Sequence, residues 1–451
     1  MPYSYLTRAQ AKAILAERLY DTGKVFFADS ELNGYLNEAL QTFNALANFY
    51  RGEFTFNSRA NVTWYDLTDA VNNPNTTRPM TMTDQDVLSA IEYHFLEPQT
   101  STYPLAWTGS AQFTVQDILN AIQQVRDEVL SESNCTVTEY LVAALSGRTF
   151  LSDSMLDVRR VCWIPTTGLG YSSNCLMPAD LWSTQAFNAG FPQKLAAIPQ
   201  IWRRSTEPPL SFDVDIQPAV PGSYDVLVIN GGGSLSTSSA TVLPVPNDWV
   251  WVIKWGAMAQ LLARDSVAND PLRAKYCLLR YKQGLAAMQN APALLGARIN
   301  NVPVVVQAVT TGDFYNANWQ GQTPGAPNQI YYSGLNLVAL NTQPTTTGYS
   351  VTASTVSNMA LPATDADFLQ VGRDDVGAVI DEAQHIAMVK CGGAEFLLTL
   401  PLHQNLLRRC ALYNSKLQAS SLYLEFLDWA AKFDPRANPV FQGVTPETVE
   451  S

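Results

Sequence analysis

Histidine, the side chain most often used for proton transfer and metal binding near neutral pH, is scarce in this sequence. The 451 residues include only His94, His385 and His403. No two of them are four residues apart, so no helix can present a pair of imidazoles to one metal ion. At about 100° per residue, His385 lies opposite Val376 on a predicted helix, away from the apolar stripe of that helix. We therefore expect His385 to be exposed or to face a neighbouring molecule.

Three pairs of carboxylates are close enough in sequence to suggest a calcium site or a glycosidase. The pairs are Asp213 and Asp215, Asp365 and Asp367, and Asp374 and Asp375. Asp213 and Asp215 alternate with apolar residues, as on the solvent side of a half-buried strand. Asp374 and Asp375 fall in the first turn of a predicted helix, where the helix dipole favours acidic groups. These structural roles are the expected ones, and no pair is predicted to be catalytic.

Other motifs for covalent or phosphate chemistry are missing. There is no Gly-x-Ser-x-Gly nucleophile elbow. Gly231 to Gly233 follow the strand-like YDVLVI without a subsequent Lys-Ser or Lys-Thr, which favours a hairpin turn over a phosphate-binding loop. The six cysteines form no Cys-x-x-Cys, which predicts free buried thiols. A metal site of His385 with His403 and Cys391 or Cys410 is a minor alternative. The sequence predicts no catalytic residue, cofactor or metal, and we do not expect an enzyme.

The charge balance also limits the possible partners. Lys and Arg total 28 against 40 Asp and Glu, a net charge of -12, so the chain as a whole repels a phosphate backbone. Sequence-specific binding of nucleic acid is not expected, although an acidic wall would let a duplex slide past. Charged residues make up 15% of the chain against an average of about 25%, so its surface is covered by Ser, Thr, Asn and Gln or by neighbouring subunits. The first residues, MPYSYLTRAQ, lack the apolar region of a secretory signal.

The most apolar stretch of the chain contains three tryptophans. The run from Trp249 to Ala263 is shorter than the roughly 20 residues that cross a bilayer, so no membrane association is expected. Trp251 and Trp255 share one face of the predicted helix, and Trp249 points away from them. A helix that is apolar nearly all round is buried on several sides, inside a bundle or between subunits. Trp249, Trp251 and Trp255 are therefore candidates for an assembly interface.

The periodicity along the chain predicts an α+β fold, in which helical bundle units carry an inserted small antiparallel β domain and extended arms. The expected units are an N-terminal helical unit, 1–149, with a long loop, 53–82; a small β domain, 150–245; a helical hairpin, 246–296; a β-rich inserted lobe or arm, 297–364; and a C-terminal helical unit, 365–451. Residues 297–364 lack the large apolar residues needed for a core of their own. The expected helix caps are Ser30, Thr83, Thr114, Asn247 or Asp248, and Asp270 followed by Pro271, and Gly52 is expected to end the second helix.

The C-terminal unit carries a heptad-like pattern. Apolar residues and small residues alternate at spacings of four and three at Leu406, Cys410, Tyr413, Leu417, Ser420, Leu424, Leu427 and Ala431. The pattern predicts one helix of about 26 residues, roughly 39 Å long. A helix of this length needs a long partner, so Tyr413, Leu417, Leu424 and Leu427 are further candidates for an assembly interface.

Two segments resemble virion structural proteins of tailed bacteriophages. They are VPNDWVWVIKWGAMAQLLARDSVANDPLRAKYCLLRYKQGLAAM and DFLQVGRDDVGAVIDEAQHIAMVKCGGAEFL, together about a sixth of the chain. Helical units with β insertions and long arms are also similar in kind to head-to-tail adaptor (neck) proteins. The resemblance implies a homo-oligomeric ring, twelvefold or sixfold, that contacts portal and tail proteins and lets DNA pass without specificity. It further implies a place in the virion, after assembly in the host cytoplasm.

Two alternatives remain open at the level of sequence. One is another structural component of the phage particle, such as a tail tube, collar, fibre-docking or head decoration protein. The other, of a different class, is a virion-associated hydrolase.

Overall fold

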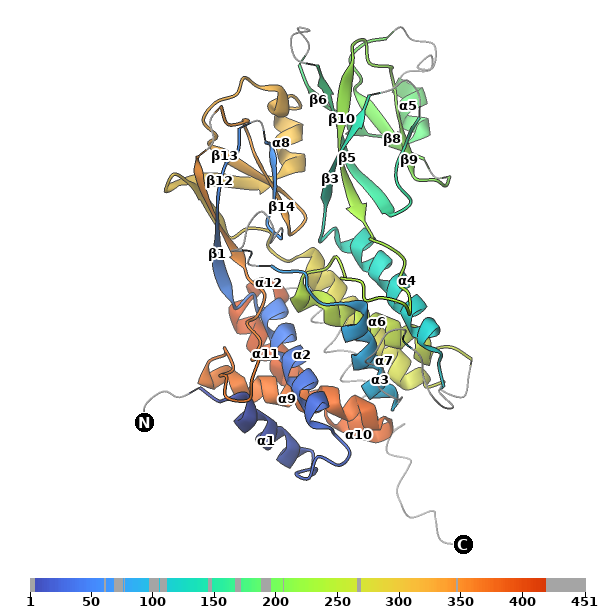
Figure 1. The fold of residues 1–451 in the computed structure, drawn as a ribbon, viewed down its shortest axis with the longest axis vertical. Helices are drawn as coiled ribbons and strands as arrows, with labels where there is room; N and C mark the ends of the chain where they lie inside the picture. The colour runs from blue at the N-terminus through green and yellow to red at the C-terminus, as the bar shows by residue number, and fades with distance from the viewer. Residues whose placement is uncertain are drawn as a thin grey trace.

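The computed structural model describes residues 5–418 with gaps at 61, 69–75, 77, 97–104, 106–111, 145–147, 167–171, 188–195, 206, 266–268 and 346–347. Two β lobes lie side by side above a body of helices (Figure 1). The α+β class predicted from the sequence is confirmed.

The helical body is built from segments that are distant in sequence. Its helices are α1 (Arg8–Arg18), α2 (Asp29–Ala47), α3 (Asp84–Phe95), α4 (Val115–Ser133), α6 (Val250–Leu262), α7 (Pro271–Gln289), α9 (Arg373–Cys391), α10 (Gly393–Leu398), α11 (Leu400–Tyr413) and α12 (Ser415–Gln418). Helix α6 packs against α3, α4 and α7, and one continuous apolar core links it to α2, α9 and α11. The all-round apolar character of α6 therefore reflects a central position in the body.

Glycines allow the closest helix contacts in this body. A Cβ on Gly256 of α6 would lie 2.5 Å from Val125 Cγ1 of α4 and 2.9 Å from the Tyr281 ring of α7. A Cβ on Gly284 of α7 would lie 2.5 Å from Val252 of α6. The close spacing between α4, α6 and α7 therefore depends on the lack of a side chain at Gly256 and Gly284.

The first β lobe, which we call the curled-sheet lobe, is a seven-stranded sheet in the order β1-β15-β11-β12-β13-β14-β2. Its strands are β1 (Arg51–Asn57), β2 (Trp64–Asp66), β11 (Gly296–Ile299), β12 (Val302–Ala308), β13 (Gln329–Ser333), β14 (Leu337–Leu340) and β15 (Ser350–Val356), with α8 (Val309–Tyr315) and the 3-10 turn η3 (Trp319–Gly321) packed beside them. The sheet curls until the rings of Phe56 in β1 and Tyr65 in β2 lie 4.6 Å apart. Residues 53–82, expected to form a long loop, supply most of β1 and all of β2, and these strands complete the core of this lobe.

The second lobe, which we call the sandwich lobe, packs two four-stranded sheets face to face. One sheet has the order β3-β10-β5-β6, with β3 (Thr138–Ala143), β5 (Met155–Pro165), β6 (Asn174–Cys175) and β10 (Gly222–Asn230). The other has the order β4-β9-β8-β7, with β4 (Thr149–Phe150), β7 (Met177–Pro178), β8 (Ile201–Arg204) and β9 (Ser211–Val214), and α5 (Leu181–Phe187) follows β7. Alternating residues of β10 give this lobe its core: Tyr224, Val226 and Val228 face the second sheet.

Helix boundaries agree with the sequence where capping is local. Thr83, Thr114 and Asp270 each accept a backbone hydrogen bond at the start of α3, α4 and α7, as predicted. The prediction for α2 is wrong at both ends: the cap is Ala28, and the helix ends at Ala47, so Gly52 lies within β1.

Two further boundary predictions are wrong. Neither Asn247 nor Asp248 caps α6, because both lie in a 3-10 turn, η2 (Asn247–Trp249), that precedes it. The heptad helix is interrupted at Asn414, where the backbone is extended (φ -120°, ψ 92°). The Asn414 side chain donates to the carbonyl of Leu46 at 2.8 Å, which fixes the break against the end of α2.

Candidate functional site

The three tryptophans proposed for assembly lie within the core of the chain. Trp249, Trp251 and Trp255 are 6%, 3% and 0% exposed. Trp249 and Trp251 do not point apart: their rings stack with centroids 6.5 Å apart, because Trp249 belongs to the 3-10 turn and not to the helix. Contacts within the chain account for all three side chains.

The C-terminal candidates for an assembly interface differ in their surroundings. Leu417 is buried in the same core, and Tyr413 is half exposed with its hydroxyl donating to Asp375 at 2.7 Å. Leu424 and Leu427 lie outside the described residues.

The charged residue of α6 is matched inside the body. Lys254 Nζ lies 2.5 Å from Glu38 of α2, and Trp255 Nε1 donates to the same carboxylate at 2.9 Å. Burial lowers the pKa of Lys254, and Glu38 opposes that shift. Burial also holds the pKa of the neighbouring His94 well below its usual value, with Lys254 adding to the effect. This pair ties α2 to α6.

A second buried network joins α7, α9 and α11. Arg280 Nη1 donates to Glu382 at 2.7 Å, and His403 Nδ1 lies 2.7 Å from the other oxygen of Glu382. His385 pairs with the hydroxyl of Tyr276 and, at 2.8 Å, with that of Thr399. The prediction that His385 is exposed is therefore wrong. Helix α9 is covered on more than one side, so the part of its polar face that carries His385 meets other helices, although Asp374 in the first turn is exposed.

Burial shifts both histidines of this network toward the neutral form. Burial lowers the pKa of His385 to about 3. Burial and the Arg280 guanidinium lower the pKa of His403. Burial works to raise the pKa of Glu382, but Arg280 and His403 outweigh it and hold that pKa well below its usual range. Because Arg280, Glu382, His385 and His403 are 0% exposed, no substrate can reach this constellation.

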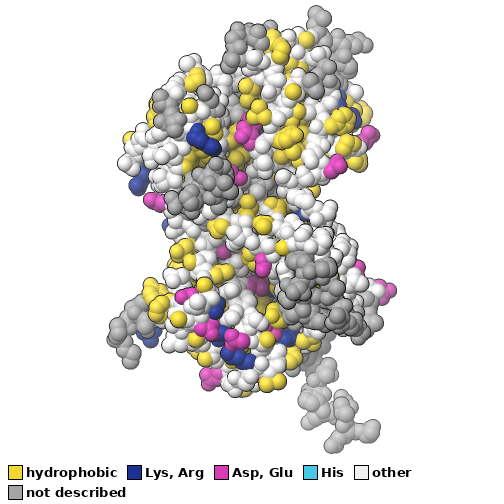
Figure 2. All heavy atoms as spheres, viewed as in Figure 1, with side chains coloured by type: hydrophobic (Ala, Val, Ile, Leu, Met, Phe, Trp, Pro, Cys, Tyr) yellow, Lys and Arg dark blue, Asp and Glu magenta, His cyan; other side chains and the backbone are white. Residues whose placement is uncertain are grey.

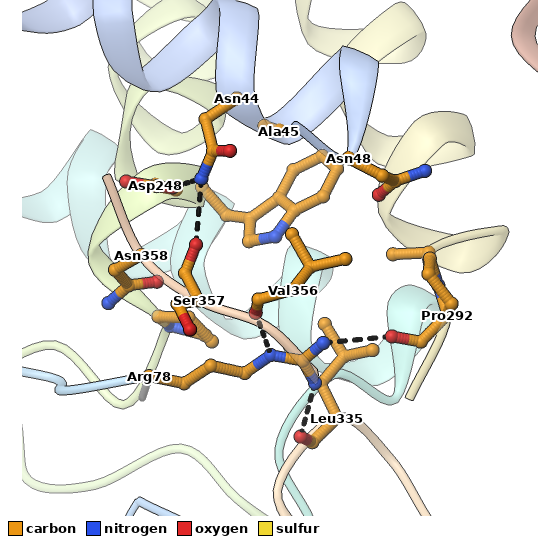
Figure 3. A pocket seen from close by; sticks show the side chains of 13 residues that line it. Asn44, Ala45, Asn48, Arg78, Asp248, Pro292, Leu335, Val356, Ser357 and Asn358 are labelled. Carbon is orange, nitrogen blue, oxygen red and sulfur yellow. Dashed lines mark hydrogen bonds between the residues drawn. The ribbon is translucent and has the colours of Figure 1, made fainter. Parts of the chain in front are cut away.

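A joint between the body and the curled-sheet lobe is centred on Arg78, and we call it the waist joint (Figure 3). The buried guanidinium donates to four backbone carbonyls: Val356 at 2.8 Å, Leu335 at 2.6 Å, Pro292 at 2.8 Å and Ala293 at 3.1 Å. One side chain thus holds the ends of α7, β13 and β15 together.

Asn44 and Asp248 form the other side of the waist joint. Asp248 accepts from the backbone N–H of Met359 at 2.9 Å and from the amide of Asn44, which also donates to the carbonyl of Ser357 at 2.8 Å. Burial raises the pKa of Asp248 to about 7, although Asn44, Met359 and Arg78 oppose the shift. A cavity of about 20 Å³ between these groups has room for one water molecule. No sequence pattern pointed to Arg78 or Asn44, because their partners come from distant segments.

The two lobes meet at Arg160 of β5, which is buried on the sheet face opposite the sandwich core; we call this contact the lobe joint. Arg160 Nε lies 2.7 Å from Asp313, and Nη2 donates to Gln320 at 2.9 Å and contacts Cys175 Sγ at 2.7 Å. The guanidinium also lies 5.6 Å from the ring of Trp64 and 5.5 Å from that of Trp319, at cation–π distance.

Asp225 completes the lobe joint from β10. It accepts from Trp64 Nε1 at 3.0 Å and from the Gln320 amide at 2.6 Å. Burial, with Asp225 as a second cause, raises the pKa of Glu139 on the adjacent β3 to about 7. The lobe joint therefore fixes β5 and β10 of one lobe against β2 and η3 of the other.

The carboxylate pairs have structural partners. Asp365 binds Arg8 and Lys12, Asp375 binds Arg409, and Asp213 lies 3.4 Å from Arg148. Asp215 is buried, contrary to the prediction of a solvent-facing pair, and accepts from the N–H groups of Gln200 and Ile201. Asp367 accepts from the N–H of Thr364, and Asp374 is exposed.

The other predicted motifs are also accounted for. All six cysteines are free, and five of them are buried, as predicted; Cys391 is exposed, so the prediction of a buried thiol is wrong there. Gly231 to Gly233 do not form a hairpin turn: Gly231 donates to Ser154, and the carbonyl of Gly233 accepts from Arg126. Among the described residues no cluster of three or more His, Cys, Asp or Glu side chains could hold a metal ion. Within the same part of the chain no helix combines the length and apolarity needed to cross a bilayer.

Large apolar side chains are exposed on both lobes. The most exposed are Leu141, Phe150, Met177 and Trp182 on the sandwich lobe and Val302, Val305, Phe314 and Tyr315 on the curled-sheet lobe. Figure 2 shows hydrophobic side chains spread over the face of the two lobes, with few charged side chains among them. No protein-family model and no curated protein matches this chain.

Proposed function

We propose that the chain is a structural protein of a tailed-bacteriophage virion, and that it forms a homo-oligomeric ring between portal and tail proteins through which DNA passes. The observation that carries the proposal is a contrast in the use of side chains. Buried charged groups tie the lobes to each other and to the body, whereas large apolar groups are left on the lobe surfaces. A subunit that acts by assembly needs both features.

The curled-sheet lobe supplies a surface suited to contact between copies. Residues 296–364 contain no charged residue except Arg298 and Asp313, and Asp313 is paired with Arg160 inside the lobe joint. Copies that each carry a net charge of -12 repel one another, so contacts between them favour uncharged surfaces. Depletion of charge together with exposed aromatic rings is typical of the centre of protein interfaces.

The acidic balance of the chain is compatible with DNA passage. A duplex that must move through a ring is hindered by basic side chains that bind phosphate. Catalysis is not part of the proposal, because the buried His and carboxylate networks are closed to substrate.

Electron microscopy and mass measurement of the purified full-length chain, alone and with portal protein, test the proposal. We expect rings, and we expect Trp182→Ser and Phe314→Ser to weaken them while leaving the thermal unfolding midpoint unchanged. Tyr20→Ser, a change at a side chain that is 96% exposed on the helical body, serves as the matched control. A chain that stays monomeric with portal protein present refutes the proposal.

A further inference from the structure

Within the described part of the chain, strand β3 forms a sheet edge without the usual protection against pairing. Edge strands in native proteins are protected by being short, charged or covered. Among the described strands, β2, β4, β6 and β7 have three residues or fewer, and β1 exposes Arg51 and Glu53. Strand β3 has six residues at the edge of its sheet and exposes Tyr140 and Leu141.

The register of β3 against β10 shows which backbone groups point outward. Ala144 N–H donates to Gly222, so residues of even number face β10 and residues of odd number face away. The first outward residue, Val137, is covered by Asn336, which bonds both its N–H and its carbonyl. The outward groups of Glu139, Leu141 and Ala143 have no hydrogen-bond partner within the part of the chain that the structure describes.

We propose that β3 pairs antiparallel with β3 of a second copy of this chain, about a twofold axis at Leu141. Outward groups can bond only to outward groups, so the residues that pair must all have odd numbers. An axis at Leu141 is the register that pairs all three: Leu141 with Leu141, and Glu139 with Ala143, in both directions. The sheet β3-β10-β5-β6 of one copy and the same sheet of the second copy then form one continuous sheet.

The side chains fit this register. On the face toward the lobe joint, the Leu141 side chains meet at the axis, and each is 60% exposed in the single chain. On the other face, Tyr140 lies opposite Val142 of the second copy, which makes an aromatic and β-branched pair of the kind that stabilises sheets. The two Glu139 carboxylates are offset by four residues, about 13 Å along the strand, so the like charges do not meet. This self-complementarity is the reason for assigning the edge to a second copy rather than to another protein.

Pairing through β3 is independent of the proposed ring. A twofold contact uses the same patch on both copies and closes after two, whereas a ring needs head-to-tail contacts. Loss of the pair with rings intact, or of rings with the pair intact, therefore separates the two proposals.

Substitutions at Leu141 test the contact in the full-length chain. Leu141→Lys places two ammonium groups at the axis, and we expect the dissociation constant of the pair, measured by sedimentation, to rise at least tenfold. Leu412→Lys is the matched control, since Leu412 is 71% exposed on α11, and it should leave the constant unchanged. Leu141→Pro removes an outward N–H and keeps the ladder to β10, so it should also separate the copies without unfolding the lobe.

Cysteine cross-linking tests the register. In a Cys391→Ser background, Leu141→Cys should give a cross-linked pair on mild oxidation, because residues in a hydrogen-bonded antiparallel pair have Cα atoms about 5.5 Å apart. Glu139→Cys alone should not cross-link, whereas the same change combined with Ala143→Cys should. A chain that stays single at high concentration, an unchanged constant for Leu141→Lys, or cross-linking by Glu139→Cys alone overturns the proposal.

Discussion

Replacement of Asp248 by Asn is expected to change how the stability of the protein depends on pH. The side chain is 3% exposed, and burial raises its pKa from 3.8 to about 7. Only Oδ2 is hydrogen-bonded, and Oδ1 has no hydrogen-bond partner among the described residues. An asparagine can therefore keep the acceptor for Asn44 and Met359 and remove the ionisable group.

The direction of this pH dependence follows from the number of protons that the folded and the unfolded state bind. Between pH 4 and pH 7 the carboxyl of the unfolded chain has lost its proton and that of the folded chain retains it. The folded state thus binds more protons, and the free energy of unfolding falls as the pH rises through this window. A difference of about three pKa units corresponds to about 4 kcal/mol, at about 1.4 kcal/mol per unit.

Urea unfolding of the wild-type chain and of Asp248→Asn, measured between pH 4 and pH 8, gives the difference in free energy directly. We expect the variant to gain about 4 kcal/mol relative to the wild type across this range, because other titrating groups cancel in the difference. Asp374→Asn, a change at an exposed carboxylate, is the matched control for the loss of one negative charge. Parallel pH curves for the wild type and Asp248→Asn would refute the reasoning.

The remaining predictions concern packing in the helical body, and urea unfolding checks each of them. Gly256→Ala should destabilise the fold by about 1–3 kcal/mol through contact with α4 and α7, whereas Gly34→Ala, whose Cβ meets nothing within 4 Å, should stabilise it by up to about 1 kcal/mol. Glu382→Gln leaves the Arg280 charge buried without its carboxylate and should lower stability by about 3–5 kcal/mol. Leu417→Asp buries a charge in the core and should lower stability by several kcal/mol, so unchanged stability with lost assembly would show that Leu417 is an interface residue instead.

Local chemistry was predictable from the sequence, and long-range contacts were not. The caps at Thr83, Thr114 and Asp270 depend on side chains within three residues of the helix start, so the pattern is contained in a short window. The pairing of β1 with β15 joins residues about 300 positions apart in sequence, and no periodicity reports it. Taken without that pairing, residues 297–364 are too poor in large apolar residues to have a core of their own.

Buried contacts explain why the predictions for His385 and for the C-terminal helix were wrong. Helical periodicity assumes one buried face, so it placed His385 in solvent, although α9 is covered on more than one side. The heptad pattern likewise continued through Asn414, because a spacing rule does not detect a side chain that bonds to the end of another helix. In both cases contacts with distant parts of the chain, which a spacing rule does not include, account for the error.

The placement of buried charge bears on how such a subunit could assemble. Arg78 and Arg160 each sit where segments from distant parts of the chain meet, and each is held by several acceptors, so a rotation of one lobe would leave a buried guanidinium without partners. Leaving a charged group unpaired costs several kcal/mol, which makes the two joints stiff. Ordering flexible parts on association lowers affinity, whereas lobes fixed in advance avoid that loss. A chain with few charged residues that places Arg78 and Arg160 in internal joints is therefore suited to hold several surfaces in one fixed arrangement. Simultaneous contacts with more than one neighbour require such an arrangement.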